Sequence, residues 1–70
     1  MEYIPMSSSN IKEIAYNSKN KELHIRFTSG ALYTYFEVPE SAFTDFKNAD
    51  SAGGYFSSEI KNVFTYERIE

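Results

Sequence analysis

The chain has 70 residues, which suits one domain spanning residues 1–70, and its 41% hydrophobic and 24% charged content is typical of a globular protein. The net charge of −3 argues against DNA as a partner, because DNA-binding proteins usually carry a basic patch. There is no cysteine, and the scattered acidic residues lack the spacing of a calcium loop, so we expect no metal and no cofactor. No apolar stretch resembles a signal peptide or a membrane span, which predicts a cytoplasmic protein without membrane contact.

The N-terminal part predicts one strand preceded by a less regular segment. Residues 1–10 contain Pro5 and a polar run, and we expect a loop or an edge strand there. Ile11–Tyr16 carries several apolar residues and predicts a short strand. The polar segment 17–21 follows, and its asparagines tolerate the left-handed conformation that a turn requires.

A period of two residues identifies the clearest strand of the chain. Leu23, Ile25 and Phe27 are apolar, and the residues between them are polar. Gly30 comes shortly afterwards and can adopt a positive φ without a steric clash. A loop of about three residues that ends in glycine is a common connection between two strands of a hairpin.

The length of that loop decides which aromatic residues face the core. With a three-residue loop, Tyr33 and Tyr35 lie on the same face as Leu23. A loop shorter or longer by one residue would place Leu32 and Phe36 there instead, because a slip of one residue exchanges the two faces of a strand. We favour the three-residue loop.

The second half of the chain changes to a helical period. Pro39 is expected to end the third strand, because it has no N–H to donate. Glu40–Ala49 has apolar residues at spacings of three and four and predicts an amphipathic helix. The segment 50–54 interrupts it, and Tyr55–Val63 predicts a second helix, with Ser51 or Asp50 as its cap. Phe64–Ile69 suits an irregular segment or a short strand.

These elements predict an α+β fold in which a three-stranded antiparallel β-meander is followed by two α-helices packed on one face. A chain this short needs large apolar side chains to form its core, and most of its aromatic residues are expected to serve that purpose. The predicted core consists of Ile14, Leu23, Ile25, Phe27, Phe43, Phe46, Phe56 and Ile60.

The sequence contains no arrangement of residues that is typical of an active site. His24 is the only histidine and lies on the polar side of its strand, where an exposed structural role is the simpler interpretation. No serine lies in a nucleophile-elbow context. We therefore expect a non-enzymatic protein with no catalytic residues, and a small hydrolase is a distant alternative.

The aromatic third strand is the most suggestive candidate surface. If Tyr33 and Tyr35 were half-exposed on the sheet, they could stack RNA bases, and Arg26 and Lys61 could contact phosphates. Alternatively, both rings belong to the core, which the favoured register and the acidic net charge support.

The order of the motifs resembles that of the KTSC domain over residues 6–66. This family is named for its occurrence at the C-terminus of some lysyl-tRNA synthetases, and it also occurs as free-standing small bacterial or phage proteins. The resemblance rests on Ser8-Ser9-Asn10-Ile11, on Ile14 with Tyr16, on Leu23, Ile25 and Phe27 before Ser29-Gly30, on the Y-x-Y motif Tyr33-Thr34-Tyr35, on Val38-Pro39, on the segment from Ala49 to Phe56, and on Ile60-Lys61.

The resemblance implies a small binding or accessory module without a known activity. RNA binding, tRNA included, has been proposed for the family because of the synthetase fusion. This chain has Ala52 where many members carry a basic residue, and Glu59 makes its second helix less basic than usual. The expected partner is therefore RNA or, alternatively, another protein bound through a sheet edge or a helix face. The chain itself is expected to be a monomer or a weak dimer.

Overall fold

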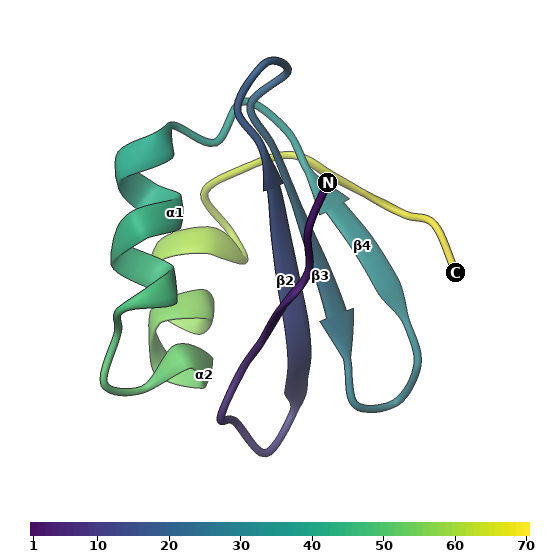
Figure 1. Ribbon diagram of the computed structural model, residues 1–70, viewed down its shortest axis with the longest axis vertical. Helices are drawn as coiled ribbons and strands as arrows, with labels where there is room; N and C mark the ends of the chain where they lie inside the picture. Colours follow the sequence, from purple (N-terminus) through teal and green to yellow (C-terminus); the bar gives the residue numbers. More distant parts are fainter.

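The alternating segments of the sequence form the middle of a sheet. The computed structural model describes residues 1–70 and pairs three strands in antiparallel fashion: β2 (Ile11–Asn17), β3 (Glu22–Phe27) and β4 (Leu32–Tyr35). Figure 1 shows these strands side by side, with the helices on one face of the sheet. The predicted arrangement of a meander covered by helices on one face is thus confirmed.

The hairpin between β3 and β4 has the register that the glycine position favours. Leu23 lies opposite Tyr35 and Ile25 lies opposite Tyr33. Gly30 has a φ of 100°, and its N–H donates to the carbonyl oxygen of Phe27 at 2.9 Å. Only glycine adopts this backbone region without strain, so the loop places both tyrosines on the face that the helices cover.

Two short edge strands bring the sheet to five strands, so the predicted number of three strands is wrong. β1 (Ile4–Pro5) pairs with β2, and β5 (Tyr66–Arg68) pairs with β4, in the spatial order β1-β2-β3-β4-β5. The sequence left both segments open between irregular structure and a short strand. Strands of two and three residues are too short to show a period, and only contacts with distant parts of the chain define them.

The third strand ends earlier than Pro39. β4 stops at Tyr35, and Glu37 adopts a φ of 55°, which turns the chain away from the sheet before the proline is reached. Pro39 then stands directly before α1 (Glu40–Lys47), where its fixed φ suits the start of a helix. The first predicted helix is therefore confirmed, with an end two residues earlier than expected.

The second helix begins before Tyr55, within the segment that was expected to interrupt the helices. α2 (Ala52–Tyr55) leads directly into a π-helical segment, η1 (Phe56–Ile60). The side chain of Ser51 accepts a hydrogen bond from the N–H of Gly54 at 3.1 Å and so caps the helix. No helix of the chain is long and apolar enough to cross a membrane.

The core lies between the sheet and the helices. Of the eight residues predicted for it, Phe27 and Phe43 are only partly buried, and the other six are buried. The favoured placement of Tyr35 in the core is confirmed, and Val38 belongs to the core although it was not predicted there. The ten buried residues of the core cluster are Ile11, Ile14, Leu23, Ile25, Tyr35, Val38, Phe46, Ala52, Phe56 and Ile60.

Candidate functional site: an aromatic pocket with a basic rim

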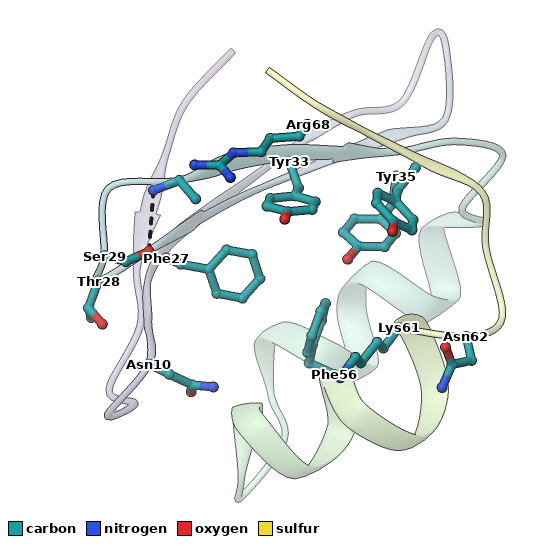
Figure 2. Close-up of a pocket in the computed structure, with 12 residues that line it drawn as sticks. Asn10, Phe27, Thr28, Ser29, Tyr33, Tyr35, Phe56, Lys61, Asn62 and Arg68 are labelled. Atoms are coloured by element: carbon teal, nitrogen blue, oxygen red, sulfur yellow. Dashed lines mark hydrogen bonds between the residues drawn. The ribbon is translucent and has the colours of Figure 1, made fainter. Parts of the chain in front are cut away.

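A pocket of about 540 Å³ opens between the β3–β4–β5 end of the sheet and η1. Figure 2 shows aromatic side chains from the sheet facing Phe56 on the helical side, with Lys61 and Asn62 beside it. Ligand pockets in proteins typically measure about 300–1,000 Å³. The lining residues are Asn10, Phe27, Thr28, Ser29, Ala31, Tyr33, Tyr35, Phe56, Lys61, Asn62, Tyr66 and Arg68.

The strand register explains why so many rings meet in this pocket. Tyr35 lies opposite Tyr66 across the β4–β5 pairing, so both side chains leave the sheet on the same face. The Tyr66 ring centroid is 5.5 Å from those of both Tyr33 and Tyr35. The rings of Tyr33 and Tyr35 stack side by side, with centroids 6.4 Å apart and an interplanar angle of 19°.

Two phenylalanines close the aromatic cluster. The Phe27 ring meets Tyr33 edge to face at 5.5 Å and meets Phe56 in the same manner at 5.4 Å. Phe56 also contacts Tyr35 edge to face at 5.7 Å. These contacts hold the ring of Tyr35 and the ring of Phe56 in fixed orientations, because edge-to-face packing is a favoured geometry of aromatic pairs. The pocket therefore has a preformed aromatic wall.

The π-helical turn of η1 brings Lys61 to the same pocket as Phe56. The N–H of Lys61 donates to the carbonyl oxygen of Phe56 at 2.8 Å, a hydrogen bond between residues five apart. This wider turn places side chains five positions apart closer to one face than an α-helix would, and both residues line the pocket. Lys61 is exposed and Phe56 is buried, so the cation stands at the mouth of the pocket.

The charge of the pocket differs in sign from that of the whole chain. Lys61 and Arg68 line it and no acidic residue does, although the net charge of the protein is −3. The Nε of Arg68 donates to the main-chain oxygen of Glu70 at 3.0 Å, and neither cation forms an ion pair with a carboxylate. Lys61 and the terminal guanidinium nitrogens of Arg68 thus remain available to an anion that enters the pocket.

The hydroxyl of Tyr35 is a polar group directed into the pocket. The residue is only 2% exposed, yet no protein group forms a hydrogen bond with its hydroxyl, whose oxygen points away from the sheet in Figure 2. Burial, and to a lesser extent the neighbouring phenols of Tyr33 and Tyr66, together raise the pKa of this phenol from 10.0 to about 12. Tyr35 therefore keeps its proton and can act as a hydrogen-bond donor at neutral pH.

The same pKa shift predicts how stability depends on alkaline pH. Folding favours the protonated phenol of Tyr35, so its contribution is complete below pH 10.0 and is lost as the pH rises towards about 12. We expect the free energy of unfolding to fall across this range, as measured by urea denaturation at each pH. The fall is expected to be smaller in Tyr35→Phe, which has no proton to lose there. An identical pH dependence in both proteins would contradict the assignment.

The structure brings three of the four predicted contact residues together. Tyr33, Tyr35 and Lys61 line the pocket, with Tyr35 in the core and Tyr33 half-buried. Arg26 does not join them. It lies on the opposite face of the sheet, where it forms ion pairs with Glu70 at 2.8 Å and Glu13 at 3.8 Å. Its alternation with Ile25 and Phe27 already implied this separation.

Sequence reasoning missed two pocket residues that come from β5. Tyr66 supplies a third phenol and Arg68 supplies the second cation. Only the pairing of Tyr66 with Tyr35 and of Arg68 with Tyr33 brings them to the site, and no local pattern in the C-terminal segment signals that register. The alternation of Tyr66 and Arg68 was the one available sign that both side chains share a face.

His24 lies in a second hollow on the open face of the sheet, away from the aromatic pocket. Its Nδ1 is 3.2 Å from the hydroxyl oxygen of Thr34, and its Nε2 is 3.6 Å from a carboxylate oxygen of Glu22. The buried Nε2 has no hydrogen-bond partner. No group of three or more histidine, aspartate or glutamate side chains has an arrangement that could hold a metal ion.

Comparison with known proteins identifies the family of this fold. The KTSC domain model matches residues 7–64. A lysine–tRNA ligase of Nostoc punctiforme is 43% identical over 59 residues, which are 84% of this chain and 10% of that protein. The chain therefore spans about a tenth of the length of this ligase.

Other relatives have nearly the same length as this chain. A protein of Stutzerimonas stutzeri is 32% identical over 71 residues, covering 100% of both chains. A crystal structure of a KTSC domain protein from Yersinia pestis superposes with a TM-score of 0.95 and 38% sequence identity, covering 99% of this chain and 97% of that one. The sequence match and the shared fold agree, and the chain belongs to the KTSC domain family.

Proposed function

We propose that this KTSC domain is a non-enzymatic, cytoplasmic binding module whose aromatic pocket receives unpaired RNA. The observation that carries the proposal is the composition of the pocket: five aromatic rings and two cations line it, and no carboxylate does. RNA-binding proteins use this combination, because unpaired bases stack on aromatic rings while the phosphates are attracted to Lys and Arg. The pocket also lacks a histidine or carboxylate that could act as a general acid or base.

The relatives supply an independent reason to consider RNA. Several proteins that contain a similar segment are named lysine–tRNA ligases. A domain that is part of a tRNA ligase lies close to tRNA, although sharing a domain with such a protein does not by itself mean sharing its function. We therefore propose RNA, including the unpaired parts of tRNA, as the partner, and Tyr33, Tyr35, Tyr66, Lys61 and Arg68 as the contacts.

Tyr66→Ala is expected to weaken RNA binding by about 5-fold to 150-fold, because stacking of one base on an aromatic ring contributes about 1–3 kcal/mol. Tyr66 is 56% exposed, so its loss removes pocket surface without opening the core. The measurement is a fluorescence-anisotropy titration of the whole chain with a labelled unstructured RNA oligonucleotide at low salt.

A matched control is Tyr3→Ala, which removes a half-buried tyrosine from the hollow on the open face. It is expected to leave the affinity unchanged. Equal loss in both variants would show that binding does not use the aromatic pocket, and absence of saturable binding by the unmodified chain would refute the RNA proposal.

A protein partner is the second proposal, with the chain as a monomer or a weak dimer. It rests on apolar side chains that remain exposed: Met1, Val63, Tyr66 and Ile69. Met1 and Ile69 both line the hollow on the open face, where a partner could cover them. Sedimentation of the chain over a range of concentrations tests self-association directly, since a second copy on this face would raise the average mass.

A further inference from the structure

We propose that the pocket holds a single unpaired nucleotide together with the phosphates on either side of it, and that the hydroxyl of Tyr35 donates a hydrogen bond to the edge of its base. This inference rests on the RNA binding proposed above and specifies how much RNA the site recognises. It follows from three features: the placement of the basic residues, the size of the pocket and the unpartnered hydroxyl at its wall.

The basic residues are placed so that only a short stretch of phosphates can be held. Of the 7 basic residues, only Lys61 and Arg68 line the pocket. Lys19 and Lys21 lie in and beside the β2–β3 turn, at the opposite end of the sheet from the β3–β4 loop that borders the pocket. Proteins that hold about 4–16 nucleotides instead use a positively charged groove along the backbone.

The remaining cations are Lys12, Arg26 and Lys47, and none of them lines the pocket; Lys12 lies on β2. The guanidinium of Arg26 is on the other face of the sheet and is paired with Glu70 and Glu13. The ammonium of Lys47 lies 5.5 Å from the centre of the Phe43 ring on α1. With a net charge of −3, the surface beyond the pocket repels a longer phosphate backbone.

The wall of the pocket offers both stacking and a directed hydrogen bond. A base that enters meets the rings of Tyr33, Tyr66 and Phe56, which line the pocket. The Tyr35 residue is only 2% exposed, but its hydroxyl is not a fully buried polar atom and forms no hydrogen bond within the protein, so it is open to the pocket. It can therefore donate to a ligand, and the base edges of RNA carry acceptors.

The first part of the test measures the number of nucleotides that contribute to binding. The whole chain is titrated calorimetrically with adenosine monophosphate and with oligoadenylates of increasing length, at several salt concentrations. We expect the intrinsic affinity to stop rising at two or three nucleotides. The slope of log K against log salt is expected to level off at about −1.4, because each single-strand phosphate contributes about −0.7.

The second part removes only the hydroxyl. Tyr35→Phe preserves the ring and is expected to weaken binding about fivefold at every length, as the loss of one hydrogen bond does. Tyr3→Phe, on the open face, is the matched control and is expected to bind like the unmodified chain.

The outcomes separate this inference from the proposed function. An affinity and a salt slope that keep growing up to long oligonucleotides would overturn the single-nucleotide site while leaving RNA binding intact. Unchanged affinity in Tyr35→Phe would overturn the role of the hydroxyl. If no nucleotide or oligonucleotide of any length binds, the proposed function itself fails.

Discussion

Phe46→Ala is expected to remove about 3–5 kcal/mol from the free energy of unfolding, the usual cost of truncating a buried phenylalanine. Phe46 is 0% exposed and is the only buried residue of α1, and its ring stacks on Tyr55 with centroids 5.7 Å apart. It therefore links α1 both to the sheet and to α2. Domains have a total stability of roughly 0.05–0.15 kcal/mol per residue, so a chain this short loses much or all of its stability.

Urea denaturation followed by circular dichroism measures this loss, and Phe43→Ala provides a control on the same helix. Phe43 stacks on Tyr16 at 4.8 Å but is only partly buried. Its truncation is expected to cost about 1–2 kcal/mol, since less apolar surface leaves water. If the two variants lost the same free energy, the core would not be centred on Phe46 as described.

Reversing both cations of the pocket, with Lys61→Glu and Arg68→Glu together, is expected to weaken RNA binding by more than about 100-fold at low salt. Placing like charges against each other at an interface costs several kcal/mol, and each 1.4 kcal/mol is about a factor of ten. Both residues are exposed, so the fold should be retained. Anisotropy titration at several salt concentrations measures the affinity and its salt dependence.

The matched control reverses Lys19 and Lys47 to glutamate, which changes the net charge by the same amount. Neither residue lines the pocket, and both are exposed. We expect this variant to retain most of its RNA affinity when both variants are compared at about 0.1 M salt, because charges more than about 10 Å apart are largely screened there. A loss as large as that of the pocket variant would mean that overall charge, and not the pocket, governs binding.

Local patterns in the sequence were sufficient to predict the centre of the sheet. The alternation of Leu23, Ile25 and Phe27 defined β3, and Gly30 fixed the loop and with it the face of Tyr33. The edge strands were not predictable in this way, because their two and three residues are defined only by pairing with β2 and β4.

The second helix shows a different limit of sequence reasoning. The predicted cap at Ser51 is confirmed, but the helix begins at Ala52 and includes the glycines at 53 and 54, which had suggested an interruption. A Cβ at Gly53 would lie 3.4 Å from the side-chain oxygen of Asn10, so α2 packs within ordinary van der Waals distance of the N-terminal segment.

The candidate site was predictable in part. Tyr33, Tyr35 and Lys61 were identified from the sequence. The tyrosines, however, were assigned either to the core or to an exposed binding surface, and a position that belongs to both was not considered. Tyr35 is buried in the core and at the same time borders the pocket, because the pocket reaches the edge of the core cluster. The π-helical segment that aligns Phe56 with Lys61 includes the hydrogen bond from the Lys61 N–H to the Phe56 carbonyl oxygen and has no sequence signature of its own.

The short borders of the sheet have a consequence for how such a domain can be used. A long free strand invites unrelated chains to add to it and so promotes fibrils. Here the edge strand β1 is two residues long and contains Pro5, and the edge strand β5 is three residues long. We therefore expect the folded domain to offer few unpaired backbone groups to an added strand and to resist aggregation through its sheet.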